Sequence, residues 1–70
     1  YAGCWMQWTV EAHEKGLSLK RFLGARLPGL SQMYLGSRVL QGLCTVNGER
    51  GEWGRKLRGG EVVTIEVDLE

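Results

Sequence analysis

The sequence predicts an α+β fold in which a hairpin of two consecutive helices packs on one side of a small, mostly antiparallel sheet. Three observations support this prediction. Two segments in the middle of the chain carry apolar residues at helical spacing, alternating apolar segments lie before and after them, and the second helical segment ends in a glycine followed by a Val-Asn-Gly turn. The 70 residues form one domain with a small core, so a deep catalytic cleft is not expected.

The first predicted element is a half-buried strand over residues 6–12. We expect Trp8 in the core and Trp5 at an edge, with stacking on nucleic-acid bases as the alternative for both. Residues 1–7 are predicted to be an N-terminal extension or edge strand, and residues 8–70 the domain itself. The chain does not begin with methionine, which suggests a fragment or a processed product. The alternating apolar residues of this strand are Met6, Trp8, Val10 and Ala12.

Capping residues delimit the two predicted helices. Ser18 and Ser31 can each accept a hydrogen bond from a free first-turn amide, and Gly42 can take the left-handed conformation that ends a helix. The first helix therefore runs from Ser18 to Pro28-Gly29, and the second covers residues 31–41. Their apolar positions are Leu19, Phe22, Leu23 and Leu27 in the first helix, and Leu35, Val39, Leu40 and Leu43 along and after the second.

Two glycines suggest how the helices meet. Gly36 lies inside the second helix, where glycine costs about 0.5–1 kcal/mol relative to alanine. We interpret it as a point of close approach to the first helix, opposite Gly24. The connection over residues 27–30 is short, which favours the helix hairpin.

The remainder of the chain predicts the rest of the sheet. A short strand over residues 43–46 leads into a tight Asn47-Gly48 turn, and residues 49–56 follow as an irregular strand or loop. After a Gly59-Gly60 turn, residues 61–69 form the clearest strand of the sequence. In this strand Val63, Ile65, Val67 and Leu69 are predicted to face inward, and Thr64, Glu66 and Asp68 outward.

The residues present argue against several chemistries. Cys4 and Cys44 lack the spacing of a zinc site and predict two reduced thiols in a cytoplasmic protein. His13 is the single histidine and has no partner at catalytic or ligand spacing, so we expect no catalytic residue, no metal and no cofactor. No apolar run approaches the roughly 18 residues that cross a bilayer, so a membrane partner is not expected.

The net charge of +1 hides an uneven distribution. Between Lys20 and Arg58 the chain has eight basic and two acidic residues, whereas both flanks are net acidic. A basic middle can give a nearly neutral molecule one positive face, which is typical of proteins that bind polyanions. The alternative is that these side chains are scattered over the surface and solvated.

The starts of both helices are candidate phosphate contacts. Lys20 and Arg21 lie in the first turn of the first helix, where cations oppose the helix dipole, and this misfit favours another use such as phosphate binding. Gln32, Tyr34 and Arg38 form a polar outer face on the second helix, whose first backbone amides can receive a phosphate. Tyr34 can stack on a base or belong to the core.

The second helix and its flanks carry a family resemblance. The chain has Leu27-Pro28 before the second helix, Ser31 opening it, Gly42 closing it and a Val46-Asn47-Gly48 turn after it. Over residues 8–67 this pattern resembles the S-four-type RNA-binding domain, or alpha-L motif, and is most similar to the version at the N-terminus of large-subunit-type RNA pseudouridine synthases. The family usually has arginine at the positions of Ser18, Gln32 and Tyr34, and aspartate at that of Lys20.

The resemblance implies binding of structured RNA, ribosomal or transfer RNA, through phosphate and shape contacts. It also implies an accessory domain of a pseudouridine synthase whose catalytic domain lies in the same parent chain, outside residues 1–70. This chain is then expected to be a monomeric binding module without catalytic activity. The alternative is a degenerate fold that serves as a protein-interaction or structural module. The predicted RNA-binding residues are Lys20, Arg21, Arg26, Gln32, Tyr34, Arg38, Arg55, Lys56 and Arg58.

Overall fold

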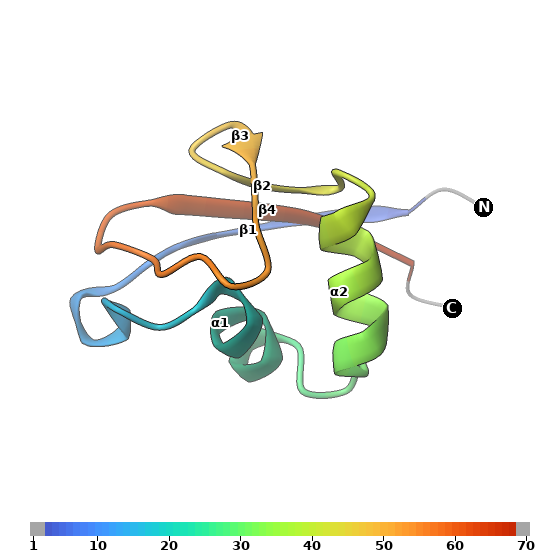
Figure 1. Ribbon diagram of the computed structural model, residues 1–70, viewed down its shortest axis with the longest axis horizontal. Helices are drawn as coiled ribbons and strands as arrows, with labels where there is room; N and C mark the ends of the chain where they lie inside the picture. Colours follow the sequence, from blue (N-terminus) through green and yellow to red (C-terminus); the bar gives the residue numbers. More distant parts are fainter. Residues whose placement is uncertain (1–2, 69–70) are drawn as a thin grey trace.

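A computed structural model of the protein describes residues 3–68. Its elements follow the chain as two helices between strands, and Figure 1 shows both helices on the same side of the sheet. In chain order the elements are β1 (Cys4–Thr9), the 3-10 turn η1 (Ala12–Glu14), α1 (Leu19–Arg26), α2 (Gln32–Leu40), β2 (Cys44–Val46), β3 (Glu49–Arg50) and β4 (Val62–Val67).

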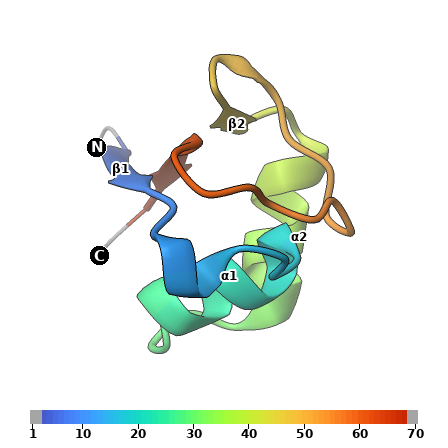
Figure 2. The same ribbon diagram turned by 90° about the vertical axis from the view of Figure 1, so that its left-hand side faces the viewer.

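The four strands form one antiparallel sheet in the order β1-β4-β2-β3. The last strand of the chain therefore lies between the first strand and the β2-β3 hairpin. The predicted α+β class, with two helices on an antiparallel sheet, is confirmed. In Figure 1 α1 is seen nearly end-on and α2 from the side, so the two helices cross steeply (Figures 1 and 2).

The predicted caps and turn form as expected. Ser18 Oγ accepts a hydrogen bond from the Arg21 amide at 3.2 Å, and Ser31 Oγ accepts one from the Tyr34 amide at 3.1 Å. Gly42 ends α2 with a φ of +81°. Asn47 and Gly48 have φ values of 52° and 82°, the two positive values that a tight hairpin turn with a right-handed twist requires.

The core lies between the sheet and the two helices. In β4 the predicted inward residues Val63, Ile65 and Val67 are fully buried, and Leu69 lies outside the described residues. Cys44 is also fully buried. The core consists of Val10, Leu19, Phe22, Leu23, Leu27, Leu35, Val39, Cys44, Val46, Leu57, Val63, Ile65 and Val67.

Two details of these elements differ from the sequence predictions. The first strand begins at Cys4 and ends at Thr9, because the chain turns into η1 after Val10, so Ala12 is exposed. Leu40 was expected to extend the apolar side of the second helix but is 75% exposed. Within residues 3–68, neither helix has the length and apolar character that a membrane crossing needs.

The prediction that Gly36 lies close to the first helix is wrong. A Cβ atom at Gly36 would lie 3.4 Å from Cε2 of Trp53, whereas one at Gly24 would lie 3.5 Å from Nε2 of Gln32. Gly36 therefore leaves room for the indole of Trp53, which arrives from the loop after β3. Gly24 instead faces the side chain of Gln32, the first residue of α2.

Candidate nucleic-acid interface

The basic side chains divide into an internally bonded group and a free group. Four arginines are bound within the domain, as described below. The other five basic residues are exposed and form no ion pair within residues 3–68. These five are Lys15, Lys20, Arg21, Lys56 and Arg58.

Arg26 is bound to η1. Its Nη2 donates to both carboxylate oxygens of Glu14, at 2.7 and 2.9 Å, and its guanidinium lies 4.9 Å from the centre of the Phe22 ring. Glu14 is 93% buried, since only 7% of its surface is exposed. The amide of Glu11 lowers the pKa of the Glu14 carboxyl below its usual range, and Arg26 adds to this effect against the cost of burial.

Arg38 and Tyr34 bind the end of β4. The Tyr34 hydroxyl accepts hydrogen bonds from Arg38 Nε at 2.9 Å and from the Asp68 amide at 2.8 Å. Arg38 also stacks on the Tyr34 ring, with 5.0 Å to its centre, and its Nη2 lies 4.0 Å from Asp68 Oδ2. Tyr34 packs against the core, so its ring is only partly available for a nucleic-acid base.

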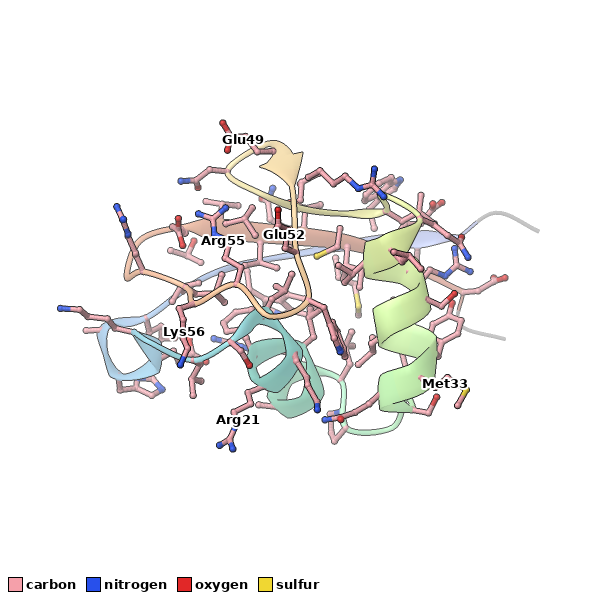
Figure 3. The ribbon with its side chains drawn as sticks, in the orientation of Figure 1. Arg21, Met33, Glu49, Glu52, Arg55 and Lys56 are labelled. Atoms are coloured by element: carbon pink, nitrogen blue, oxygen red, sulfur yellow. The ribbon has the colours of Figure 1, made fainter. Side chains whose placement is uncertain are left out.

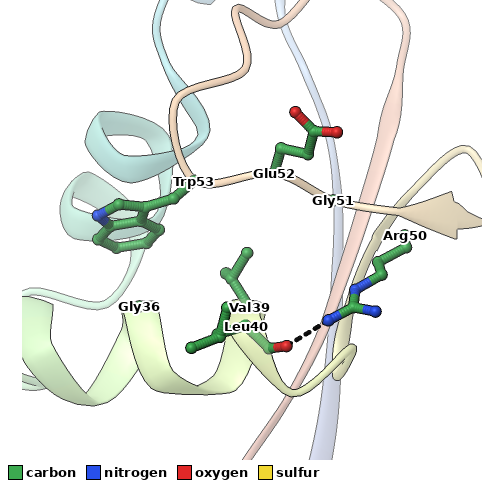
Figure 4. Close-up of a pocket in the computed structure, with 7 residues that line it drawn as sticks. All are labelled: Gly36, Val39, Leu40, Arg50, Gly51, Glu52 and Trp53. Atoms are coloured by element: carbon green, nitrogen blue, oxygen red, sulfur yellow. Dashed lines mark hydrogen bonds between the residues drawn. The ribbon is translucent and has the colours of Figure 1, made fainter.

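The remaining two internally bonded arginines hold β3 and the loop after it. Arg55 Nη2 lies 2.5 Å from Oε2 of Glu61, a carboxylate with 8% exposure that also accepts the Arg58 amide at 2.8 Å. Arg50 donates to the carbonyl oxygen of Leu40 (Figure 4). Four of the predicted RNA-binding residues thus have structural partners: Arg26, Tyr34, Arg38 and Arg55.

The start of α1 has no free backbone amide for a phosphate. The Leu19 amide donates to the carbonyl of Arg55 at 2.8 Å, the Lys20 amide to that of Trp53 at 3.2 Å, and the Arg21 amide to the Ser18 cap. The first-turn donors that usually bind anions are therefore used by the loop and the cap. Any anion at this helix start is bound by side chains.

The loop over residues 55–57 brings further cations to the start of α1. Ser18 and Lys56 form an isolated antiparallel bridge, and Gly16 and Leu17 exchange backbone hydrogen bonds with Leu57, both at 2.8 Å. Lys56 therefore lies beside the α1 start, and Lys15 precedes the paired Gly16. We call Lys15, Lys20, Arg21 and Lys56 the cationic face.

Figure 3 shows the directions of three labelled side chains. Arg21 and Lys56 both point to the side of the molecule that carries the helices, away from the sheet. Arg55 points the other way, toward the strands, where Glu61 binds it. Sequence reasoning grouped these three residues, and it placed Lys15 in an acidic flank. The bond to Glu61 separates Arg55 from the set, and the pairing of residues 16–18 with 56–57 adds Lys15 to it.

A shallow hollow of about 590 Å³ joins part of the cationic face to the start of α2. Lys20 and Arg21 line it from α1, and Gln32 lines it from the first position of α2. Leu17, Gly24 and Ala25 complete its lining. The hollow thus brings together three residues predicted to contact RNA, with two cations and one amide side chain directed at the same space.

A second hollow of about 470 Å³ lies between α2 and the loop after β3 (Figure 4). Its walls are mostly apolar and come from Gly36, Val39, Leu40 and Trp53. The charged residues at its margin are Arg50 and Glu52. The sequence did not predict this groove, because its two walls come from segments that are separated in the chain.

The described residues contain no catalytic arrangement that we recognise. The His13 side chain is 76% exposed, and its nearest acidic partner is Glu11 at 3.7 Å. Burial raises the pKa of the Cys44 thiol to about 11, which makes this thiol a poor nucleophile. No three histidine, cysteine or acidic side chains within residues 3–68 gather as metal ligands. A comparison of the chain with protein-family models and with curated proteins found no match.

Proposed function

We propose that this domain binds structured RNA by contacting phosphates with the cationic face. The observation that carries the proposal is the partition of the basic residues. Four arginines are held by internal acceptors, whereas Lys20, Arg21 and Lys56 surround one helix start and have no ion-pair partner within residues 3–68. Unpaired cations gathered at one place are a suitable surface for a polyanion.

The chemistry of this surface favours recognition of the RNA backbone and its shape. Lysine and arginine contacts to phosphates fix the position of a nucleic acid but read no sequence. The hydroxyl of Tyr34 is already bound by Arg38 and Asp68, so the proposal gives Tyr34 a structural role. Gln32 is the polar side chain in the hollow that can contact a ribose or a base edge. Arg58, which is exposed on the following loop, can extend the contact.

The family resemblance supports a more specific proposal. By this resemblance the domain is the accessory, RNA-positioning part of a cytoplasmic RNA-modifying enzyme, a pseudouridine synthase, with its catalytic domain elsewhere in the parent chain. The substrate would be a ribosomal or transfer RNA.

A salt titration of binding to a structured ribosomal RNA stem-loop tests the proposal. The variant Lys20→Ala, Arg21→Ala, Lys56→Ala should bind at least about tenfold more weakly at low salt, and the log-log salt slope should fall by about 2 to 3. The variant Lys20→Arg, Arg21→Lys, Lys56→Arg keeps every charge and should bind like the parent. Arg50→Gln removes one charge from the other side of α2 and serves as an off-face control.

Two results would contradict the proposal. One is an unchanged affinity of the triple alanine variant, provided that its circular dichroism spectrum and unfolding midpoint match those of the parent. The other is the absence of RNA binding even at low salt. The second result would favour a protein-interaction module, for which the apolar groove beside Trp53 is the specific supporting observation.

A further inference from the structure

The two edges of the sheet differ in how well they are protected. One edge is β3, which has two residues, both charged, and is therefore short and unsuited to pairing with another chain. The other edge is β1, with six residues and the sequence Cys-Trp-Met-Gln-Trp-Thr. This strand contains no charge and no proline, the two features that usually prevent edge strands from pairing. Figure 2 shows β1 at the outer margin of the sheet.

The register of β1 and β4 identifies the backbone groups at this free edge. Val10 donates to the carbonyl of Glu61 at 2.8 Å, so these opposite residues form a hydrogen-bonded pair. Because such pairs alternate with non-bonded ones, the backbone groups of Met6 and Trp8 also point to β4. The alternate residues of β1 are Trp5, Gln7 and Thr9. Their backbone N–H and C=O groups therefore point to the free edge.

Bonds on the other side of β4 agree with this alternation. The Asn47 amide donates to the carbonyl of Val62, and the Glu66 amide donates to the carbonyl of Leu43. Val62 and Glu66 thus direct their backbone groups to β2. Their partners across β1 are Thr9 and Trp5, whose own groups must then point away from β4.

The exposed edge is complementary to itself. Suppose that two copies of β1 pair antiparallel about a two-fold axis at Gln7. Trp5 then lies opposite Thr9 of the second copy, Gln7 opposite Gln7, and Thr9 opposite Trp5. These residues use the backbone groups that face the free edge, and two bonds in each of the three pairs give about six hydrogen bonds in all. Met6 lies opposite Trp8 of the second copy, on the side of the sheet that carries the helices. Both side chains are only half-buried in one copy and would be covered in the pair.

We propose that a second copy of this chain pairs with β1 and forms a two-fold symmetric dimer with a continuous eight-stranded sheet. The proposed dimer differs from the monomer that we expected from the sequence. A strand pair of this length buries less than the roughly 1,200 Å² of a stable interface, so the dimer is a weak one that dissociates on dilution. In this register Cys4 lies opposite Val10 of the second copy and not opposite that copy's Cys4. The dimer therefore does not depend on a disulfide.

Sedimentation equilibrium of the 70-residue chain with reductant present tests the dimer. We expect a reversible monomer–dimer equilibrium. Gln7→Pro removes a backbone amide that points to the free edge. On the β4 side it removes the exposed side-chain bond from Gln7 Nε2 to Thr64 Oγ1 at 3.2 Å and no backbone bond, so it should weaken the dimer at least about tenfold without unfolding the monomer. Gln7→Lys places two equal charges at the axis and should weaken the dimer most at low salt. Thr45→Lys adds the same charge to the outward side of β2 and should leave the dimer intact.

Amide protection provides an independent readout. In the parent protein the amides of Trp5, Gln7 and Thr9 should become protected from hydrogen exchange as concentration rises, while those of Met6 and Trp8 stay protected throughout. A parent chain that remains monomeric up to roughly millimolar concentration would overturn the proposal. So would a Gln7→Pro variant that folds and still dimerises. Both Gln7 variants should bind RNA like the parent, since Gln7 is not on the cationic face.

Discussion

Glu14 and Arg26 join η1 to the last turn of α1, with one arginine nitrogen at 2.7 and 2.9 Å from the two carboxylate oxygens. The carboxylate also accepts the Glu11 amide at 3.0 Å. The turn that leads from β1 to α1 is thus held by a single buried acidic side chain. Arg26, predicted from the sequence as an RNA contact, has a structural partner that lies twelve residues earlier.

This pair predicts a pH dependence of stability. The pKa of Glu14 is lowered in the folded state, first by the Glu11 amide and then by Arg26. A carboxyl whose pKa is lower in the folded than in the unfolded state stabilises the fold above its unfolded pKa, roughly 4.3, and loses this contribution as pH falls below it. Urea unfolding midpoints of the parent should therefore fall between pH 5 and pH 3 more steeply than those of Glu14→Gln. Glu52→Gln, at an exposed position, is the control, and an equally steep fall for Glu14→Gln would contradict this role.

Tyr34→Phe should lower stability without affecting RNA binding. The change removes an oxygen that accepts two hydrogen bonds, from Arg38 and from the Asp68 amide, and should cost about 1–2 kcal/mol of unfolding free energy. The ring remains, so a loss of RNA affinity is not expected. Urea denaturation and the stem-loop titration measure the two effects. If Tyr34→Ala bound RNA much more weakly while Tyr34→Phe bound normally, with both variants folded, the base-stacking alternative would be favoured.

Alanine at two glycines should have opposite effects. At Gly36 a new Cβ meets the Trp53 ring at ordinary contact distances of 3.4–3.8 Å, and α2 gains helix propensity, so Gly36→Ala should stabilise the protein by about 0.5–1 kcal/mol. At Gly51 it would lie 2.9 Å from Leu19 Cδ2 and 3.3 Å from the Cys44 carbonyl, so Gly51→Ala should cost about 1–3 kcal/mol. Urea midpoints compare them directly. A clear destabilisation by Gly36→Ala would show that the Trp53 ring packs too tightly on Gly36 to admit a methyl group.

The Asn47 side chain connects the β2-β3 turn to β4. Its Oδ1 accepts the Val62 amide at 2.8 Å, and its φ of 52° is unfavourable for most residues. Asn47→Ala should lose the hydrogen bond and add backbone strain, at about 2 kcal/mol, whereas Asn47→Gly should lose mainly the bond, at about 1 kcal/mol. Asn47→Asp keeps the acceptor and tolerates the backbone conformation, so it should remain close to the parent. Equal losses for alanine and glycine would argue against the strain component.

The two cysteines should differ in reactivity. Cys44 is fully buried and its thiol has a pKa of about 11, whereas Cys4 is half-buried at the start of β1. A thiol reagent at pH 8 should modify one cysteine per native chain quickly, and the second only in denaturant. Mass spectrometry of the modified peptides assigns the fast site. Rapid native modification of Cys44 would show that the sheet opens at β2.

Some of the candidate site could be anticipated from the sequence. Lys20, Arg21 and Gln32 were predicted together because each lies in the first turn of a predicted helix, and the structure places them around one hollow. Arg55 was predicted as part of the same basic segment as Lys56. The two side chains point in opposite directions, because Glu61 binds Arg55 and no such partner holds Lys56.

The sequence by itself determined the elements whose stabilising contacts are local. Ser18, Ser31 and Gly42 delimit the helices through bonds and conformations within a few residues, the Asn47-Gly48 turn follows from its own backbone preferences, and the alternation of β4 predicted its buried side. Only the tertiary structure decided what these elements contact. The partner of Gly36 is Trp53, the partners of the arginines are acidic side chains or carbonyls distant in the sequence, and the free edge is β1 because β4 crosses to the middle of the sheet. Such contacts depend on which segments meet in space. The apolar periodicity within one segment does not specify its partner segment.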